Sequence, residues 1–108
     1  LLSKNTVKRL SQSYSVPGKD SMLMLPTRFS EGLMIHMDNR DNFEGEGGSF
    51  IIGPNGFGHV RIGGSSATFA DHDYKISFGY MVNKLGGEYL ISKRCQNIID
   101  ASYTSLLT

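Results

Sequence analysis

His59 is the side chain best placed for chemistry in this sequence, because it stands in a glycine-rich stretch that ends in the paired Gly63 and Gly64. An imidazole can donate a hydrogen bond or carry a positive charge toward an anionic group. Two glycines just before a strand weaken that strand by roughly 0.5 to 1 kcal/mol each relative to alanine, so the usual reason for them is close approach of another backbone or a ligand. The stretch from 56 to 83 therefore predicts one wall of an active site.

The order of the short motifs in this stretch is distinctive. The triplet His59, Val60, Arg61 is followed by Ile62 and the paired glycine, and then by two strand patterns around an acidic turn, the second ending at Asn83. This arrangement resembles the C-terminal part of the β-lactamase-related serine hydrolases, which include class C β-lactamases, penicillin-binding-type peptidases and esterases. In that family a Lys-Thr-Gly or His-x-Gly triplet opens the strand that lines the active site. The resemblance covers residues 56 to 83 well and extends weakly to Leu107.

The resemblance implies roles for individual residues. His59 would replace the lysine of the triplet and offer a donor or a positive charge to the substrate or to the proton-transfer groups. The backbone N–H just after the triplet, which the family uses as an oxyanion donor, corresponds to Ile62, and such a donor does not depend on the side chain. Gly63 and Arg61 would line the substrate-binding site. Arg61 stands where the family has glycine. Its side chain would either narrow the substrate pocket and add a positive charge to it, or mark a site that has lost its activity.

The family's Ser-x-x-Lys and Tyr-x-Asn motifs are missing from this sequence. We therefore expect residues 1 to 108 to be the C-terminal portion of a single β-lactamase-related domain, without the N-terminal catalytic part and inactive alone. The parent would hydrolyse an ester or amide of a small-molecule or peptide substrate through an acyl-serine intermediate, with no metal or organic cofactor. The alternatives are a catalytically inactive family member that serves as a binding or assembly module, or an unrelated small β-rich interaction domain.

Other candidate sites are weaker. The three histidines are widely spaced in different predicted elements, and no Cys or His partner stands at zinc spacing. Asp71 and Asp73 lack the following glutamate of a calcium loop and are interpreted as solvated turn residues. The glycine-rich segment 45–58 is not followed by the Gly-Lys-Ser/Thr of a phosphate-binding loop. A single cysteine, Cys95, cannot form an internal disulfide and is predicted to be a reduced core residue.

Composition excludes some partners. The formal net charge is +1 with acidic and basic residues interspersed, so neither nucleic acid nor a membrane surface is an expected partner. The longest apolar run, 22–25, is far shorter than the roughly 20 residues that a membrane span needs. The 13 glycines favour turns and strands over a helical bundle. The five methionines are interpreted as core fillers.

The positioning elements follow from periodicity and from turn residues. Ser3 is expected to cap a short helix that runs to about Ser13. Short strands are predicted over 22–25 and 32–37, and a loop over 38–56 apart from 50–52. A hairpin is predicted from strands 65–70 and 76–82 around the turn 71–73.

The strongest helix is predicted to begin at Glu88 or Tyr89, with one apolar face. The residues of that face are Ile91, Cys95, Ile98, Ile99, Ser102, Tyr103 and Leu106. This face should pack on the alternating apolar side of the second hairpin strand. The sequence therefore predicts an α+β fold: an antiparallel β-sheet with a packed C-terminal helix, as in part of a β-lactamase/transpeptidase-like fold.

Overall fold

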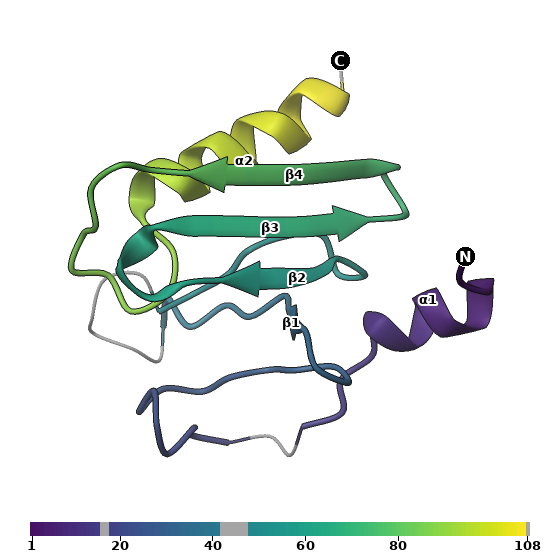
Figure 1. Ribbon diagram of the computed structural model, residues 1–108, viewed down its shortest axis with the longest axis horizontal. Coiled ribbons are helices and arrows are strands. Elements are labelled where there is room, and N and C mark those ends of the chain that lie inside the picture. The colour runs from purple at the N-terminus through teal and green to yellow at the C-terminus, as the bar shows by residue number, and fades with distance from the viewer. Residues whose placement is uncertain (16–17, 42–47, 108) are drawn as a thin grey trace.

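The computed structural model describes residues 1–15, 18–41 and 48–107. The elements follow in the order α1 (Lys4–Leu10), β1 (Met34–Ile35), β2 (Phe57–Val60), the 3-10 turn η1 (Ile62–Gly64), β3 (Ser66–Asp71), β4 (Ile76–Met81) and α2 (Lys93–Leu106). The strands form one four-stranded antiparallel sheet in the order β1-β2-β3-β4. Helix α2 lies across one face of this sheet, and α1 lies apart from it (Figure 1). The α+β prediction of an antiparallel sheet with a packed C-terminal helix is confirmed.

The hairpin of β3 and β4 forms where the alternating pattern predicted it, within one residue at each end. Its register pairs Ser66 with Met81 and Asp71 with Ile76. The turn between the strands ends at Lys75, which has a positive φ of 56°. Because paired residues share a face of the sheet, the register divides the strands into two sets of side chains.

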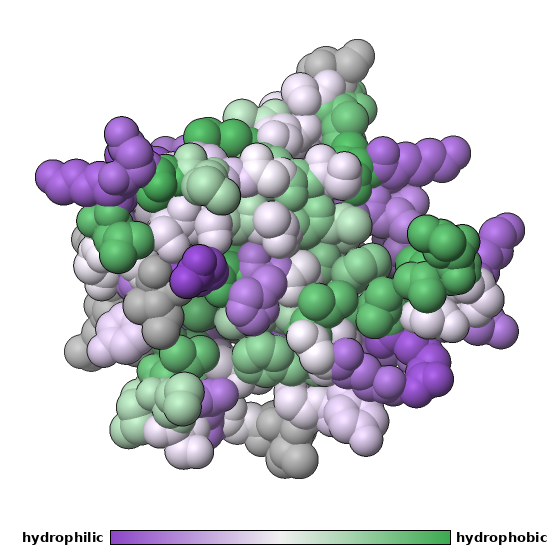
Figure 2. All heavy atoms as spheres, viewed as in Figure 1, coloured by the Kyte–Doolittle hydropathy of each residue, from purple (hydrophilic) through white to green (hydrophobic). Residues whose placement is uncertain are grey.

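The inner face of the sheet packs against α2, and the outer face points away from it. The inner face is formed by Gly58, Val60, Ala67, Phe69, Asp71, Ile76, Phe78 and Tyr80. The outer face is formed by Phe57, His59, Arg61, Ser66, Thr68, Ala70, Ser77, Gly79 and Met81. Figure 2 shows the outer face, with side chains of intermediate hydropathy over its middle and mixed hydrophilic and hydrophobic side chains around it.

Helix α2 begins later than predicted. The spacing of apolar residues in the sequence placed its start at Glu88 or Tyr89. In the structure, Ser92 has an extended conformation and its hydroxyl accepts the N–H of Cys95 at 3.1 Å, so the helix starts at Lys93. Serine is a preferred N-cap because its side chain satisfies a free N–H of the first turn. The preceding Leu90 and Ile91 are still buried, as core residues outside the helix.

The apolar face of α2 is narrower than predicted. Cys95 and Ile99 are buried and Tyr103 is half-buried, whereas Ile98 and Leu106 are each 46% exposed. A small sheet covers only the stripe of residues spaced four apart, so the neighbouring apolar positions stay in solvent. The prediction of a buried face is therefore confirmed for Cys95 and Ile99 and wrong for Ile98 and Leu106.

The N-terminal half departs further from the predictions. The Ser3 cap of α1 is confirmed, since its hydroxyl accepts the N–H of Thr6, but the helix ends at Leu10. The strand predicted over 22–25 is wrong: the Asp20 carboxylate accepts two N–H groups of this segment at 2.8 Å each and folds it into a turn. Within 32–37 only Met34–Ile35 form a strand, and both are buried.

The predicted loop 38–56 has no helix or regular strand in its described residues, apart from a bridge between Phe50 and Met37. Residues 42–47 lie outside the described residues, and 45–47 of them belong to the segment 45–58 that was considered as a phosphate-binding loop.

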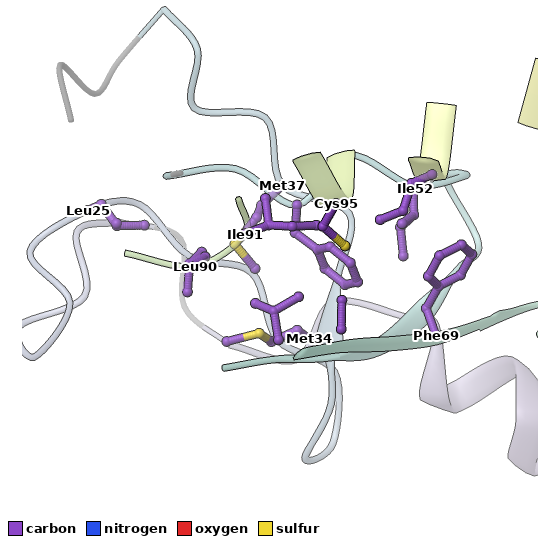
Figure 3. Close-up of a cluster of buried hydrophobic side chains, with 12 residues drawn as sticks. Leu25, Met34, Met37, Ile52, Phe69, Leu90, Ile91 and Cys95 are labelled. Carbon is purple, nitrogen blue, oxygen red and sulfur yellow. The ribbon is translucent and has the colours of Figure 1, made fainter. Parts of the chain in front are cut away.

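One core cluster fills the space between the inner face, α2 and the segments around Leu25, Phe50 and Leu90. Phe69 belongs to this cluster and stacks on the partly buried Phe78 at 5.0 Å and Tyr103 at 5.9 Å between ring centroids. Figure 3 shows side chains from the sheet and from the segments above it converging in this cluster.

The expectation that all five methionines fill the core is correct for two of them. Met34 and Met37 are buried, whereas Met22, Met24 and Met81 are 89%, 55% and 83% exposed. Met81 is exposed because the alternation of β4 places it on the uncovered outer face.

Candidate functional site

His59 lies on β2 with its side chain exposed on the outer face. Its partner across the strands is Thr68, whose own partner on β4 is Gly79, so the imidazole has small neighbours along this row. Arg61 follows two residues later in an extended conformation (φ −109°, ψ 146°) and is exposed as well. Successive side chains alternate between the faces of a strand, so His59 and Arg61 share the outer face. Sequence alone left the direction of Arg61 open.

The backbone around Ile62 has a defined direction. The N–H of Arg61 donates to the carbonyl of Ser66 on β3 at 3.1 Å. In extended backbone, consecutive N–H groups point to opposite edges, so the N–H of Ile62 points away from β3. On that side, β1 pairs with β2 only through Met34 and Ile35, whose partners are Gly58 and Phe57. The strand pairing of β1 thus stops short of the Ile62 N–H.

The paired glycine is explained by another backbone rather than by a ligand. Gly63 and Gly64 have positive φ values of 82° and 62°, which favour glycine. The N–H of Gly63 donates to the carbonyl of Glu88 at 2.9 Å, and its carbonyl accepts the N–H of Gly86 at 2.7 Å. A Cβ on Gly64 would lie 2.7 Å from the Cβ of Ser92.

Of the two predicted reasons for the paired glycine, close approach of a backbone is therefore confirmed. Because both backbone groups of Gly63 are bonded to the segment before α2, any contact of Gly63 with a substrate would depend on van der Waals approach.

Glu88 lies at the same turn and carries no sequence signal. Within the described residues, its Oε2 atom is buried and has no hydrogen-bond partner. Burying a carboxylate oxygen without a hydrogen-bond donor destabilises the fold. The segment around Gly86 and Glu88 is therefore held in place by its backbone hydrogen bonds to Gly63 and not by the Glu88 side chain.

Asp71 is the clearest error among the predicted turn residues. It is 1% exposed, and its Oδ2 accepts the hydroxyl of Tyr103 at 2.6 Å while Oδ1 accepts the N–H of Asp73 at 3.1 Å. The Tyr103 hydroxyl in turn accepts the N–H of Gly53 at 2.9 Å. Burial, reinforced by the hydrogen bond to Asp71, raises the pKa of Tyr103 above its usual 10.0. Asp71 faces inward because β3 alternation places it on the inner face.

Asp73 agrees with the prediction of a solvated turn residue. Its side chain is 43% exposed. Its carboxylate accepts the side-chain amide of Asn55 at 2.7 Å and lies 3.5 Å from Nε2 of His72.

Two open hollows lie elsewhere on the surface. One, of about 360 Å³, is bordered by Gly53, Tyr74, Asp100 and Tyr103 among others. The second, of about 470 Å³, lies between α1 and the β3–β4 turn, with Lys4 and His72 on its sides. Neither includes His59 or Arg61 in its lining. The predicted wall is therefore an exposed strand face beside a backbone turn, apart from these two hollows.

The remaining ionisable candidates have structural surroundings. Cys95 is 1% exposed, and burial raises the pKa of its thiol to about 11, so the prediction of a core residue is confirmed. Nδ1 of His36 lies 2.7 Å from the carbonyl of Ile52. Across residues 1–15, 18–41 and 48–107, no three His, Cys, Asp or Glu side chains gather closely enough to hold a metal ion.

In the part of the chain that the structure describes, no helix combines the length and the apolar character needed to cross a membrane. No known family model matches the chain, and no curated protein matches it significantly.

Proposed function

We propose that this chain forms one wall of the active site of a β-lactamase-related serine hydrolase, which cleaves an ester or amide through an acyl-serine intermediate. The nucleophile and the groups that handle its proton would come from polypeptide beyond residues 1–108. The observation that carries the proposal is the hydrogen bond from the Arg61 N–H to Ser66 on β3, which turns the following Ile62 N–H away from β3, while His59 is exposed on β2.

The chemistry that this wall would supply is electrostatic. Acyl transfer develops negative charge on the carbonyl oxygen, and a preorganised backbone N–H stabilises that charge. The Ile62 N–H would act as one such donor, and a second would come from the missing part. His59 would donate a hydrogen bond or a positive charge to the substrate or to the leaving group. Arg61 on the same face would favour a substrate with an anionic group.

The proposal is tested with the complete protein that contains this chain, using the release of p-nitrophenol from p-nitrophenyl acetate. We expect an initial burst of product, as an acyl-enzyme requires, and we expect His59→Ala to lower kcat on the order of a hundredfold with an unchanged melting temperature. Thr68→Ala is the matched control, since Thr68 is exposed on the same face opposite His59. If His59→Ala instead lowered the melting temperature together with kcat, the imidazole would have a structural role.

The second candidate is a catalytically inactive member of the same family that serves as a binding or assembly module. It is favoured by Arg61, a long cation at the position where the family has glycine, and by the bonded backbone groups of Gly63. Arg61→Gly in the complete protein separates the two candidates. A protein that shows no burst before or after this substitution is the inactive member, and a burst that appears only in Arg61→Gly identifies Arg61 as the block.

A further inference from the structure

The outer edge of β4 is an open strand edge in the described fold. Strand β4 is the last in the sheet order, with β3 on its inner side. The opposite end of the sheet is different, because β1 is covered by a bridge from Phe29 to Met34. An edge strand presents a row of N–H and C=O groups that can pair with another strand, and natural edges are usually protected by charges, proline or bulges.

Strand β4 has none of these protections. The six residues from Ile76 to Met81 include no charged residue and no proline, and they pair with β3 in continuous register. The N–H of Val82 donates to Ser65 on the β3 side, so alternation directs the backbone groups of Ser77, Gly79 and Met81 to the open edge. A Cβ added to the central Gly79 would meet nothing within 4 Å.

We propose that the occupant of this edge is β4 of a second copy of the chain, paired antiparallel about a two-fold axis at Gly79. In this register Gly79 faces Gly79 of the other copy, and Ser77 faces Met81. Every outward N–H and C=O of these residues then finds a partner, because residues of hydrogen-bonded antiparallel pairs exchange both bonds. The interface is isologous and closed, so it yields a dimer rather than a filament.

The side chains favour the same register. On the inner face, Phe78 of one copy comes opposite Tyr80 of the other, and both are only half-buried in one copy. Aromatic pairs directly across antiparallel strands stabilise the pairing. In this register Lys75 faces Asn83 and Lys84 faces Tyr74, so neither lysine faces another lysine. No like charges are therefore placed opposite each other.

This inference does not use the residues of the proposed hydrolase wall. Strand β4 lies at the opposite end of the sheet from β1, with β3 between it and the strand that bears His59. The two-fold pairing thus leaves His59 and Arg61 accessible on both copies.

Sedimentation equilibrium of the 108-residue chain over a wide concentration series tests the proposal. We expect the average mass to rise from 11.9 kDa toward twice that value and to stop there. Gly79→Pro should remain at the monomer mass, because it removes the central outward N–H without touching the bonds to β3. Gly79→Ala keeps that N–H and is the matched control, which should still dimerise.

Amide hydrogen exchange of the unsubstituted chain gives a readout that does not depend on a variant folding. The amides of Ser77, Gly79 and Met81 should exchange more slowly as concentration rises, while those of Phe57 and Val60 should not change. A monomer at every concentration, a species larger than a dimer, or a folded Gly79→Pro that dimerises as the unsubstituted chain does would each overturn the proposal.

Discussion

The hydrogen bond between Asp71 and Tyr103 joins β3 to α2 through two side chains that sequence patterns would not pair. The Tyr103 hydroxyl donates to Asp71 and accepts from the N–H of Gly53, so one oxygen holds three segments together. We expect Tyr103→Phe to lower the free energy of unfolding by about 1 to 3 kcal/mol, because it leaves a buried carboxylate oxygen and an N–H unpaired. Urea denaturation measures the loss.

Tyr74→Phe is the matched control for this prediction. Tyr74 contacts the ring of Tyr103 edge-on at 5.2 Å and is 42% exposed. Removing a hydroxyl from so exposed a side chain should change stability by less than about 0.5 kcal/mol. Equal losses in the two variants would contradict the role given to the Tyr103 hydroxyl.

The Cys95 thiol links stability to alkaline pH. Burial raises its pKa from 9.0 to about 11, so above pH 9.0 the unfolded chain loses this proton more readily than the folded chain does. The stability contribution is therefore complete below pH 9.0 and is lost as pH rises toward 11, at up to about 1.4 kcal/mol per pH unit. Urea denaturation at several pH values gives this slope. Cys95→Ala should remove the part of this slope that begins near pH 9.0, leaving the alkaline loss that the raised pKa of Tyr103 contributes from pH 10.0 upward.

Two of the residues that matter at the turn and in the core could not be identified from the sequence. Asp71 looked like a turn residue because Asp, His and Asp follow one another, but its buried environment depends on Tyr103, 32 positions later. Glu88 has no motif around it, and its position beside Gly86 follows from the backbone bonds between η1 and the segment before α2. Neither long-range contact is present in local residue spacing. His59 and Arg61 were singled out through the family resemblance, because the local pattern did not predict the strand β2 that bears His59.

At the scale of elements, local signals predicted the hairpin, placed β1 inside a longer predicted strand over 32–37, and missed β2. Alternation and turn residues fixed β3 and β4 within one residue because both strands and their turn are adjacent in sequence. Strand β1, in contrast, is only two residues long and forms through pairing with β2, some twenty residues later. The segment after Asp20 is apolar enough for a strand, but the Asp20 carboxylate binds its N–H groups and bends it.

Ser92 sets the start of α2 and so aligns Cys95 and Ile99 with the sheet. Its hydroxyl accepts the N–H of Cys95 from a side chain that is 2% exposed. We expect Ser92→Ala to lower the free energy of unfolding by about 1 kcal/mol, as for other lost caps. Thermal or urea unfolding followed by circular dichroism at 222 nm measures this loss.

Ser3→Ala is a matched control, since Ser3 caps α1 with the same geometry. Helix α1 contains no buried residue, so its fraying should leave global stability within about 0.5 kcal/mol. If both alanine variants lose the same stability, the cap of α2 does not determine how that helix docks.

Over the whole molecule, stability should be distributed according to burial. The core cluster joins the inner face of the sheet to α2 and to the segments around Leu25 and Phe50, whereas α1 buries none of its residues. Two hydrogen bonds from Tyr14 and Ser15 to the carbonyl of Phe29 and an exposed ion pair between Arg9 and Glu31 tie the N-terminal segment to the rest. An exposed ion pair contributes about 0 to 1 kcal/mol.

We therefore expect native-state hydrogen exchange to separate the molecule into two parts. Amides of β3, which has a paired strand on each side, should exchange only through global unfolding, whereas those of α1 should open at far lower free energy. Deleting residues 1–10 should accordingly reduce the free energy of unfolding by less than about 1 kcal/mol and leave the exchange of β3 nearly unchanged. Equal protection of α1 and β3 would contradict this, because a helix with no buried residue would then be unfolding only together with the core.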